Sequence, residues 1–138
     1  MRTLFNALIL LCAREDNRYR SVPLAMLLLL IALAVVPALV SPVPAAALLH
    51  GATALVLATP FAVLARLGRC GPADSLGVLA VSLRFDPIVA PAVIAGACMA
   101  GLLPAVLARH REHPVESKEE IPFFPCLAVA TIFAGRWM

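Results

Sequence analysis

Long apolar stretches without charged residues constrain this chain more than any other feature. Residues 22–40 and 43–65 each approach the ~20 apolar residues that a helix needs to cross a bilayer. Over the whole chain, 62% of residues are hydrophobic and 14% are charged. A chain of 138 residues cannot bury so much apolar surface in its own interior, because a small domain leaves a large share of its area exposed. We therefore expect lipid to be the solvent around much of the protein.

The apolar stretches are continuous rather than alternating, which favours helices over the strands of a membrane barrel. Prolines mark two of the breaks, at residues 41–44 and 85–87, because proline removes a backbone donor and disfavours helix at the residue before it. The predicted fold is all-α, a polytopic membrane bundle of about six transmembrane helices in a single domain, residues 1–138. The expected helices cover residues 3–13, 22–40, 43–65, 74–83, 92–108 and 121–133.

The start of the chain has some features of a secretory leader, since Arg2 precedes the apolar residues 4–11. Leucines occupy the positions where a cleavage site would need small residues. We therefore interpret this stretch as a retained first helix.

Basic residues concentrate in alternate connections between the expected helices, which orients the bundle by the positive-inside rule. These connections, which we expect to be cytoplasmic, hold Arg14, Arg18, Arg20, Arg66, Arg69, Arg109, Arg111 and Lys118, whereas the other side holds Arg2, Arg84 and Arg136. The sequence thus predicts a multi-pass protein of the cell (plasma) membrane with both ends of the chain outside. Basic residues scattered beside membrane lipids, without interleaved aromatics, give no indication of a nucleic-acid partner.

The chain has three aspartates, and the predicted topology places two of them, Asp16 and Asp74, at the cytoplasmic face. A carboxylate beside the hydrocarbon is costly, and two that lie together cannot easily both ionise, so such a pair supplies one acid and one base. Sequence does not assign the two roles. Each residue also has a simpler interpretation: Asp74 as a helix cap and Asp16 as a juxtamembrane charge. Asp86, in an outside turn before Pro87, is given no catalytic part.

The remaining reactive residues show no ligand pattern, and we expect no metal, nucleotide or redox cofactor. The four cysteines, Cys12, Cys70, Cys98 and Cys126, lack paired metal-ligand spacing and are interpreted as packing residues. Helix polarity or solvation accounts for His50, and solvation for the histidines at 110 and 113. The polar residues 109–120 are predicted to form a solvated loop, which could gate a substrate.

Three short motifs follow one another along the chain. Residues 16–23 read Asp-Asn-Arg-Tyr-Arg-Ser-Val-Pro, residues 71–74 read Gly-Pro-Ala-Asp, and residues 118–125 read Lys-Glu-Glu-Ile-Pro-Phe-Phe-Pro. In order and placement they resemble three elements of the type IV prepilin peptidases and archaeal preflagellin peptidases. Those elements are an Asp-x-Arg-x-Arg-x-Ile-Pro segment, a Gly-x-Gly-Asp or Gly-Gly-Ala-Asp element, and an Ile-Pro-Phe-x-Pro start to the last helix. The resemblance spans nearly the whole chain.

The resemblance implies an aspartyl endopeptidase that removes the short basic leader of prepilin-like or archaellin precursors at the cytoplasmic membrane face. Asp16 and Asp74 would be the catalytic pair. The residues that would support the motifs are Arg18, Arg20, Pro23, Gly71, Ala73, Pro122, Phe123 and Pro125. Pro122 and Pro125 could leave backbone carbonyls unpaired near the site. Arg18 and Arg20 are better explained as lipid anchors than as substrate contacts.

The chain departs from the family pattern at two positions. Leu76 stands where a lysine is common, and Leu24 stands where an asparagine often follows the first motif. The methyltransferase portion of the large bacterial enzymes has no counterpart, so N-methylation of the product is not expected. The alternative is a catalytically inactive homologue that acts as a non-enzymatic membrane assembly or transport subunit, with both aspartates capping helices or binding a cation. Neither the precursor nor the oligomeric state follows from the sequence.

Overall fold

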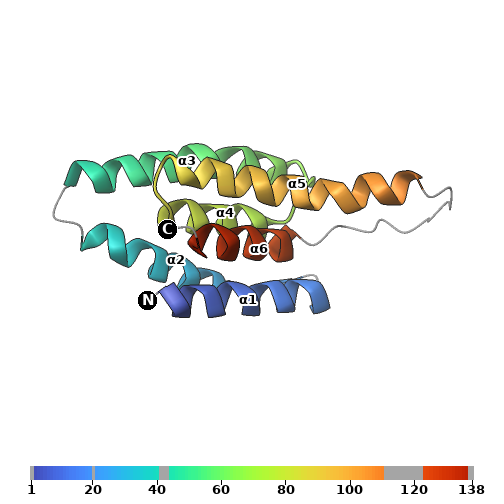
Figure 1. Ribbon diagram of the computed structural model, residues 1–138, viewed down its shortest axis with the longest axis horizontal. Helices are drawn as coiled ribbons and strands as arrows, with labels where there is room; N and C mark the ends of the chain where they lie inside the picture. The colour runs from blue at the N-terminus through green and yellow to red at the C-terminus, as the bar shows by residue number, and fades with distance from the viewer. Residues whose placement is uncertain (1, 20, 41–43, 111–122, 137–138) are drawn as a thin grey trace.

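The computed structural model describes residues 2–19, 21–40, 44–110 and 123–136, and within these ranges every regular element is an α-helix (Figure 1). The predicted all-α class is thereby confirmed. The helices are α1 (Arg2–Tyr19), α2 (Leu24–Leu39), α3 (Pro44–Arg66), α4 (Pro72–Arg84), α5 (Val89–His110) and α6 (Phe123–Arg136).

The helix ends follow the prolines, but α1 is longer than its apolar run. We expected it over residues 3–13, and it continues to Tyr19, because charged residues such as Arg14 and Glu15 are good helix formers once a helix has begun. The carbonyl of Pro23 then accepts the amides of Met26 and Leu27 and so begins α2. Asp16 consequently lies inside the last turns of α1 and not in a loop after it.

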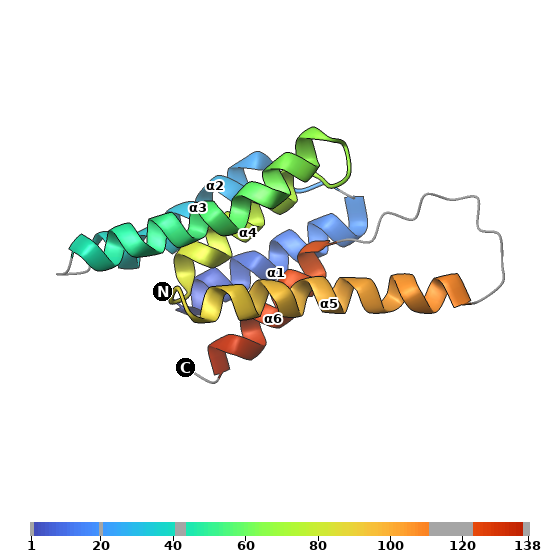
Figure 2. The same ribbon diagram turned by 90° about the horizontal axis from the view of Figure 1, so that it is seen from above.

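Helix α4 is central to the bundle, because it packs against α2, α3, α5 and α6. Helix α1 packs mainly against α6, the last helix of the chain, and less extensively against α2. In both ribbon views the C-terminal ends of α1, α3 and α5 and the N-terminal ends of α4 and α6 point to the same end of the bundle (Figures 1 and 2). These helix ends therefore gather at one end of the bundle, which we call the aspartate end because it holds Asp16 and Asp74.

Helix α1 contacts its neighbours through one regular stripe of side chains. Its buried residues recur at intervals of three and four, as one face of a helix requires, and are Phe5, Leu8, Ile9, Cys12 and Ala13. Position 16 continues this series, since it lies three and four residues beyond the last two members. Asp16 is thus on the face of α1 that packs into the bundle, where it is half-buried.

Helices α4 and α6 approach each other closely at Gly77. Gly77 is buried, and a Cβ added to it would lie 2.7 Å from Cζ of Phe124 and 3.2 Å from Cδ2 of Leu127. Phe124 and Leu127 are themselves fully buried, so the ring has little room to withdraw. Asp74 lies three residues before Gly77, on the same face of α4.

Helix α3 is long and apolar enough to cross a membrane over Ala45–Arg66, and only 11% of its most apolar window is buried. Large side chains cover its outer surface, with Leu48 75% exposed and Val56 71% exposed. The other apolar segments in the described ranges, Leu24–Val36, Val89–Leu103 and Phe123–Arg136, are shorter. Exposed apolar surface of this extent on α3 is typical of a face that contacts a membrane or another protein.

Replacing Gly77 with alanine is expected to destabilise the bundle by about 1–3 kcal/mol, because the added methyl group overpacks the contact with Phe124. Denaturant unfolding in detergent micelles measures the change. The matched control is Gly96→Ala in α5, where a Cβ would meet nothing within 4 Å. There alanine should raise stability by about 0.5–1 kcal/mol through its better helix propensity. Equal effects of the two substitutions would contradict the tight α4–α6 contact.

Candidate active site

The turn between α3 and α4 is fixed by a glycine-ended helix. Gly68 adopts a left-handed conformation with φ of 67°, which a residue with a Cβ adopts only at a cost. Its amide donates to the carbonyl of Ala65, and the amide of Arg69 donates to the carbonyl of Leu64 at 2.9 Å. These two bonds form the Schellman motif that closes α3 and reverses the chain. The reversal directs residues 69–71 toward the start of α4.

Asp74 lies in the first turn of α4 and is held by the residue before that helix. Its carboxylate oxygen Oδ2 accepts the amide of Gly71 at 3.1 Å, while its own amide donates to the Gly71 carbonyl at 3.1 Å. Pro72 follows as the first helical residue, where its missing amide is not needed. The reciprocal bonds place the carboxylate at the positive end of the α4 dipole, which stabilises its ionised form. The side chain is half-buried.

Asp16 binds the beginning of α6, 108 residues further along the chain. Its Oδ2 atom accepts the backbone amide of Phe124 at 3.3 Å. Amides in the first turn of a helix have no partner within that helix, so a side chain from elsewhere has to supply one. Asp16 therefore caps α6 from α1. This contact joins the first motif to the third.

Phe124 connects the elements that carry the two aspartates. Its amide donates to Asp16, and its ring fills the space above Gly77, one turn beyond Asp74. Both ribbon views show the end of α1, the start of α4 and the start of α6 at the aspartate end (Figures 1 and 2). The structure thus brings two half-buried carboxylates, each bound to a helix N-terminus, to one end of the bundle.

The predicted supporting residues have mixed surroundings. The Arg18 guanidinium lies 5.2 Å from the centroid of the Tyr19 ring, in the last turn of α1, where a cation is favoured. Pro23 is exposed and begins α2, and Ala73 packs against the main core. Pro125 is half-buried in the first turn of α6. Arg20 and Pro122 lie outside the described residues.

Leu76, at the position where a lysine was expected from the resemblance, packs against the main hydrophobic core. No cation is therefore supplied from that position to the neighbouring carboxylate. The amide of Gly71 and the α4 dipole both stabilise the negative charge of Asp74.

Cys70, directly before Gly71, also belongs to this turn. Its thiol donates to the carbonyl of Phe61 in α3 at 3.3 Å, which ties the turn to the preceding helix. Partial burial raises the pKa of the Cys70 thiol, and the negative charge of Asp74 raises it further. Cys70, which the sequence interpretation treats as a packing residue, therefore also holds the turn through its thiol hydrogen bond. Among the described residues no three His, Cys, Asp or Glu side chains gather as metal ligands would.

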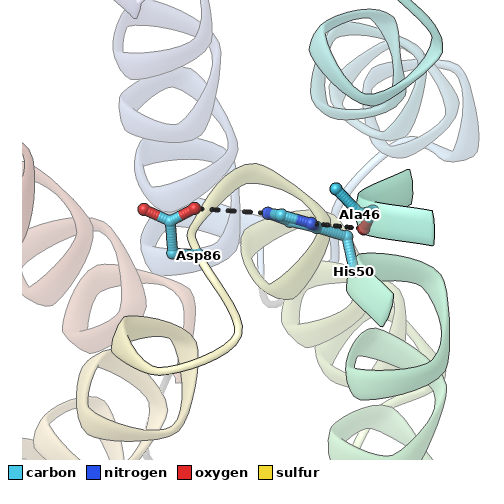
Figure 3. A network of polar contacts seen from close by, with 3 residues as sticks. All are labelled: Ala46, His50 and Asp86. Atoms are coloured by element: carbon cyan, nitrogen blue, oxygen red, sulfur yellow. Dashed lines mark hydrogen bonds and ion pairs between the residues drawn. The ribbon is translucent and has the colours of Figure 1, made fainter. Parts of the chain in front are cut away.

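A second polar contact lies at the opposite end of the bundle and was not expected. His50 Nε2 lies 3.4 Å from Oδ1 of Asp86, and His50 Nδ1 lies 2.8 Å from the carbonyl of Ala46 (Figure 3). The sequence interpretation attributes His50 to helix polarity or solvation and gives Asp86 no catalytic part, so it does not pair the two residues. Because a carbonyl oxygen only accepts, the Nδ1 atom carries a proton, and the contact with Asp86 is attractive when Nε2 is protonated too. The predicted topology contains the signal, since it places both residues near one membrane face, and an ionisable residue in a span usually has a partner.

Comparison with protein-family models, with curated proteins and with solved structures finds no match to this chain. Functional inference therefore depends on the residues and their geometry.

In a variant that keeps Cys70 as its one cysteine, Asp74→Asn is expected to increase the rate of maleimide alkylation at pH 8 roughly twofold or more. Removing the negative charge lowers the thiol pKa, so a larger share is thiolate, which is the reactive form. Asp86→Asn, at the other end of the bundle, is the control and should leave the rate unchanged. A rate that Asp74→Asn does not alter would show that no carboxylate charge acts on Cys70.

The His50–Asp86 contact is expected to stabilise the bundle by less than about 1 kcal/mol, because Asp86 is 70% exposed and solvent screens the pair. A double-mutant cycle with His50→Gln and Asp86→Asn measures this coupling energy. The two single changes should therefore be close to additive. A coupling energy well above about 1 kcal/mol would contradict a solvent-screened pair.

Proposed function

We propose that this protein is a membrane aspartyl endopeptidase that cleaves the leader of prepilin-like or archaellin precursors at the cytoplasmic membrane face. One observation carries the proposal. Phe124, in the third motif, binds Asp16 of the first motif through its amide and packs on Gly77, one turn after Asp74 of the second motif. Segments that resemble the peptidase family in sequence thus also converge in space. Asp16 and Asp74 are the proposed catalytic pair.

The membrane part of the proposal extends from one helix to the bundle. The apolar, mostly exposed α3 supports insertion, and the shorter apolar helices would span the bilayer beside it. Arg14, Arg18, Arg66 and Arg69 belong to segments at the aspartate end, which is the distribution expected for a cytoplasmic face. The proposed protein is therefore multi-pass, with its site facing the cytoplasm.

The chemistry requires one proton shared by two carboxyl groups. The protonated group polarises the carbonyl of the scissile peptide bond, and the ionised group takes a proton from water as the water oxygen attacks the carbonyl carbon. The proton is then delivered to the departing amine. Asp16 and Asp74 each accept a backbone amide, which stabilises the ionised form of each group. Repulsion between the two carboxylates opposes ionisation of both and would keep one proton shared between them. The pair would titrate as a unit, without a metal or cofactor.

A second candidate function is supported by the same hydrogen bonds. Because each aspartate accepts an amide at a helix N-terminus, both could serve only to cap α6 and α4. Leu76 packs against the core at the position where the resemblance leads us to expect a lysine, and this substitution is also consistent with a catalytically inactive homologue. Under this alternative the protein is a membrane assembly or transport subunit.

The deciding experiment is cleavage of a panel of prepilin and archaellin precursors by the purified protein reconstituted in liposomes. We expect cleavage at the leader junction, and a loss of kcat of about a hundredfold or more for Asp16→Asn and for Asp74→Asn. These substitutions preserve shape while removing an acid or base, whose contribution is typically 10²–10⁴-fold.

Asp86→Asn is the matched control, since it makes the same change at the other end of the bundle, and it should retain full activity. Folding of every variant is checked by thermal unfolding in micelles. Folded wild-type protein that cleaves no precursor would favour the assembly subunit. Cleavage that survives either active-site substitution would contradict the proposed pair.

A further inference from the structure

Phe61 occupies an unusual position, because it contacts the surroundings of both aspartates and belongs to none of the three motifs. It lies in the second half of α3, directly after Pro60, and its side chain is half-buried. Its backbone and its ring make separate contacts with two other segments.

The backbone contact leads to Asp74. The Phe61 carbonyl accepts the Cys70 thiol at 3.3 Å, across the turn that Gly68 closes. Cys70 is joined directly to Gly71, whose amide binds the Asp74 carboxylate at 3.1 Å. Phe61 in α3 is therefore connected to the start of α4 through Cys70, Gly71 and Asp74.

The ring contact leads to Asp16. The Phe61 ring packs against the Phe123 ring with centroids 5.5 Å apart and planes tilted by 41°, an arrangement that aromatic pairs favour. Phe123 is the first residue of α6 and precedes Phe124, whose amide binds Asp16. The ring pair thus fixes α3 against the turn of α6 that holds the first aspartate.

The Phe61–Phe123 ring pair is the main contact described between α3 and the start of α6. Helices α3 and α6 have no extensive packing of their own within the described part of the chain. Both rings instead pack on a small buried cluster made of Ala58, Val78 and Ile94, from three different helices. Moving the Phe61 ring would therefore shift the α3–α4 turn relative to the start of α6.

We propose that Phe61 is a positioning residue that sets the placement of Asp74 relative to Asp16 through its contacts with Cys70 and Phe123. Its catalytic meaning rests on the proposed peptidase function, but its geometric meaning does not. Loss of the ring should leave Asp16 bonded to the start of α6 and Asp74 bonded to the start of α4, and should widen the range of distances between the two carboxylates.

The test uses dipolar EPR on the full chain in liposomes, with spin labels on cysteines introduced at the exposed positions 17 and 69. In this background Cys12, Cys98 and Cys126 are replaced with alanine, and Cys70→Ser retains a hydroxyl donor for the Phe61 carbonyl. We expect Phe61→Ala and the milder Phe61→Leu to broaden the distance distribution, whereas Phe61→Tyr, which keeps the ring, should retain it. Phe133→Ala removes an exposed ring at the far end of α6 and is the matched control.

Phe123→Leu should broaden the distance distribution as Phe61→Leu does. The double variant should broaden it little further, because each change removes the same ring–ring contact. In the active enzyme Phe61→Leu should lower kcat about tenfold and change KM less than about twofold, because misplaced catalytic groups slow the chemical step more than binding. An unchanged distribution in both Phe61→Ala and Phe61→Leu, or an equal broadening by Phe133→Ala, would overturn the inference. Broadening without any cleavage by the wild type would uphold the positioning role and reject the peptidase.

Discussion

The first turn of α6 is the constraint on which the rest of this bundle depends. Its amides need partners from outside the helix, and in an apolar surrounding an amide without one is expensive. Asp16 satisfies the Phe124 amide, so the last helix is attached to the first. The ring of Phe124 packs on α4 at Gly77, where the absence of a side chain lets the two helices approach. Backbone chemistry and side-chain packing at one residue therefore locate three helices together.

The two buried hydroxyl groups of the described helices are hydrogen-bonded within their own helices. Buried hydroxyls on Ser82 and Thr131 donate to carbonyls four residues earlier in their own helices, at 2.7 Å each, and so need nothing from other helices. The long-range polar contacts occur near the ends of the bundle instead. Asp16 bonds across helices at one end, and His50 pairs with Asp86 at the other. Between these two ends, the core of the described helices consists mainly of apolar side chains.

The sequence predicts the helices well because their apolar lengths and the prolines between them act locally. It also places Asp16 and Asp74 at one end, since alternate connections of a helical bundle share a side. It does not predict that α1 continues to Tyr19, because an apolar run ends at its first charge while helical hydrogen bonding does not. The seating of Phe124 on Gly77 was also missed, although a glycine inside an apolar helix often marks a close approach. Such contacts join residues far apart in the chain and depend on how the helices settle together.

The pairing of α1 with α6 has a consequence for the order in which the protein is made. Synthesis proceeds from the N-terminus, so helices α2 to α4 can pack together while the ribosome is still adding later residues. Asp16 obtains its partner amide only when residue 124 of 138 has emerged. Until then α2 is the extensive packing partner of α1 among the described helices, and the part of the buried stripe that packs against α6 has no cover. The aspartate end is consequently completed only once α6 has begun to form, and until then a nascent chain lacks the contact that joins Asp16 to the start of α6.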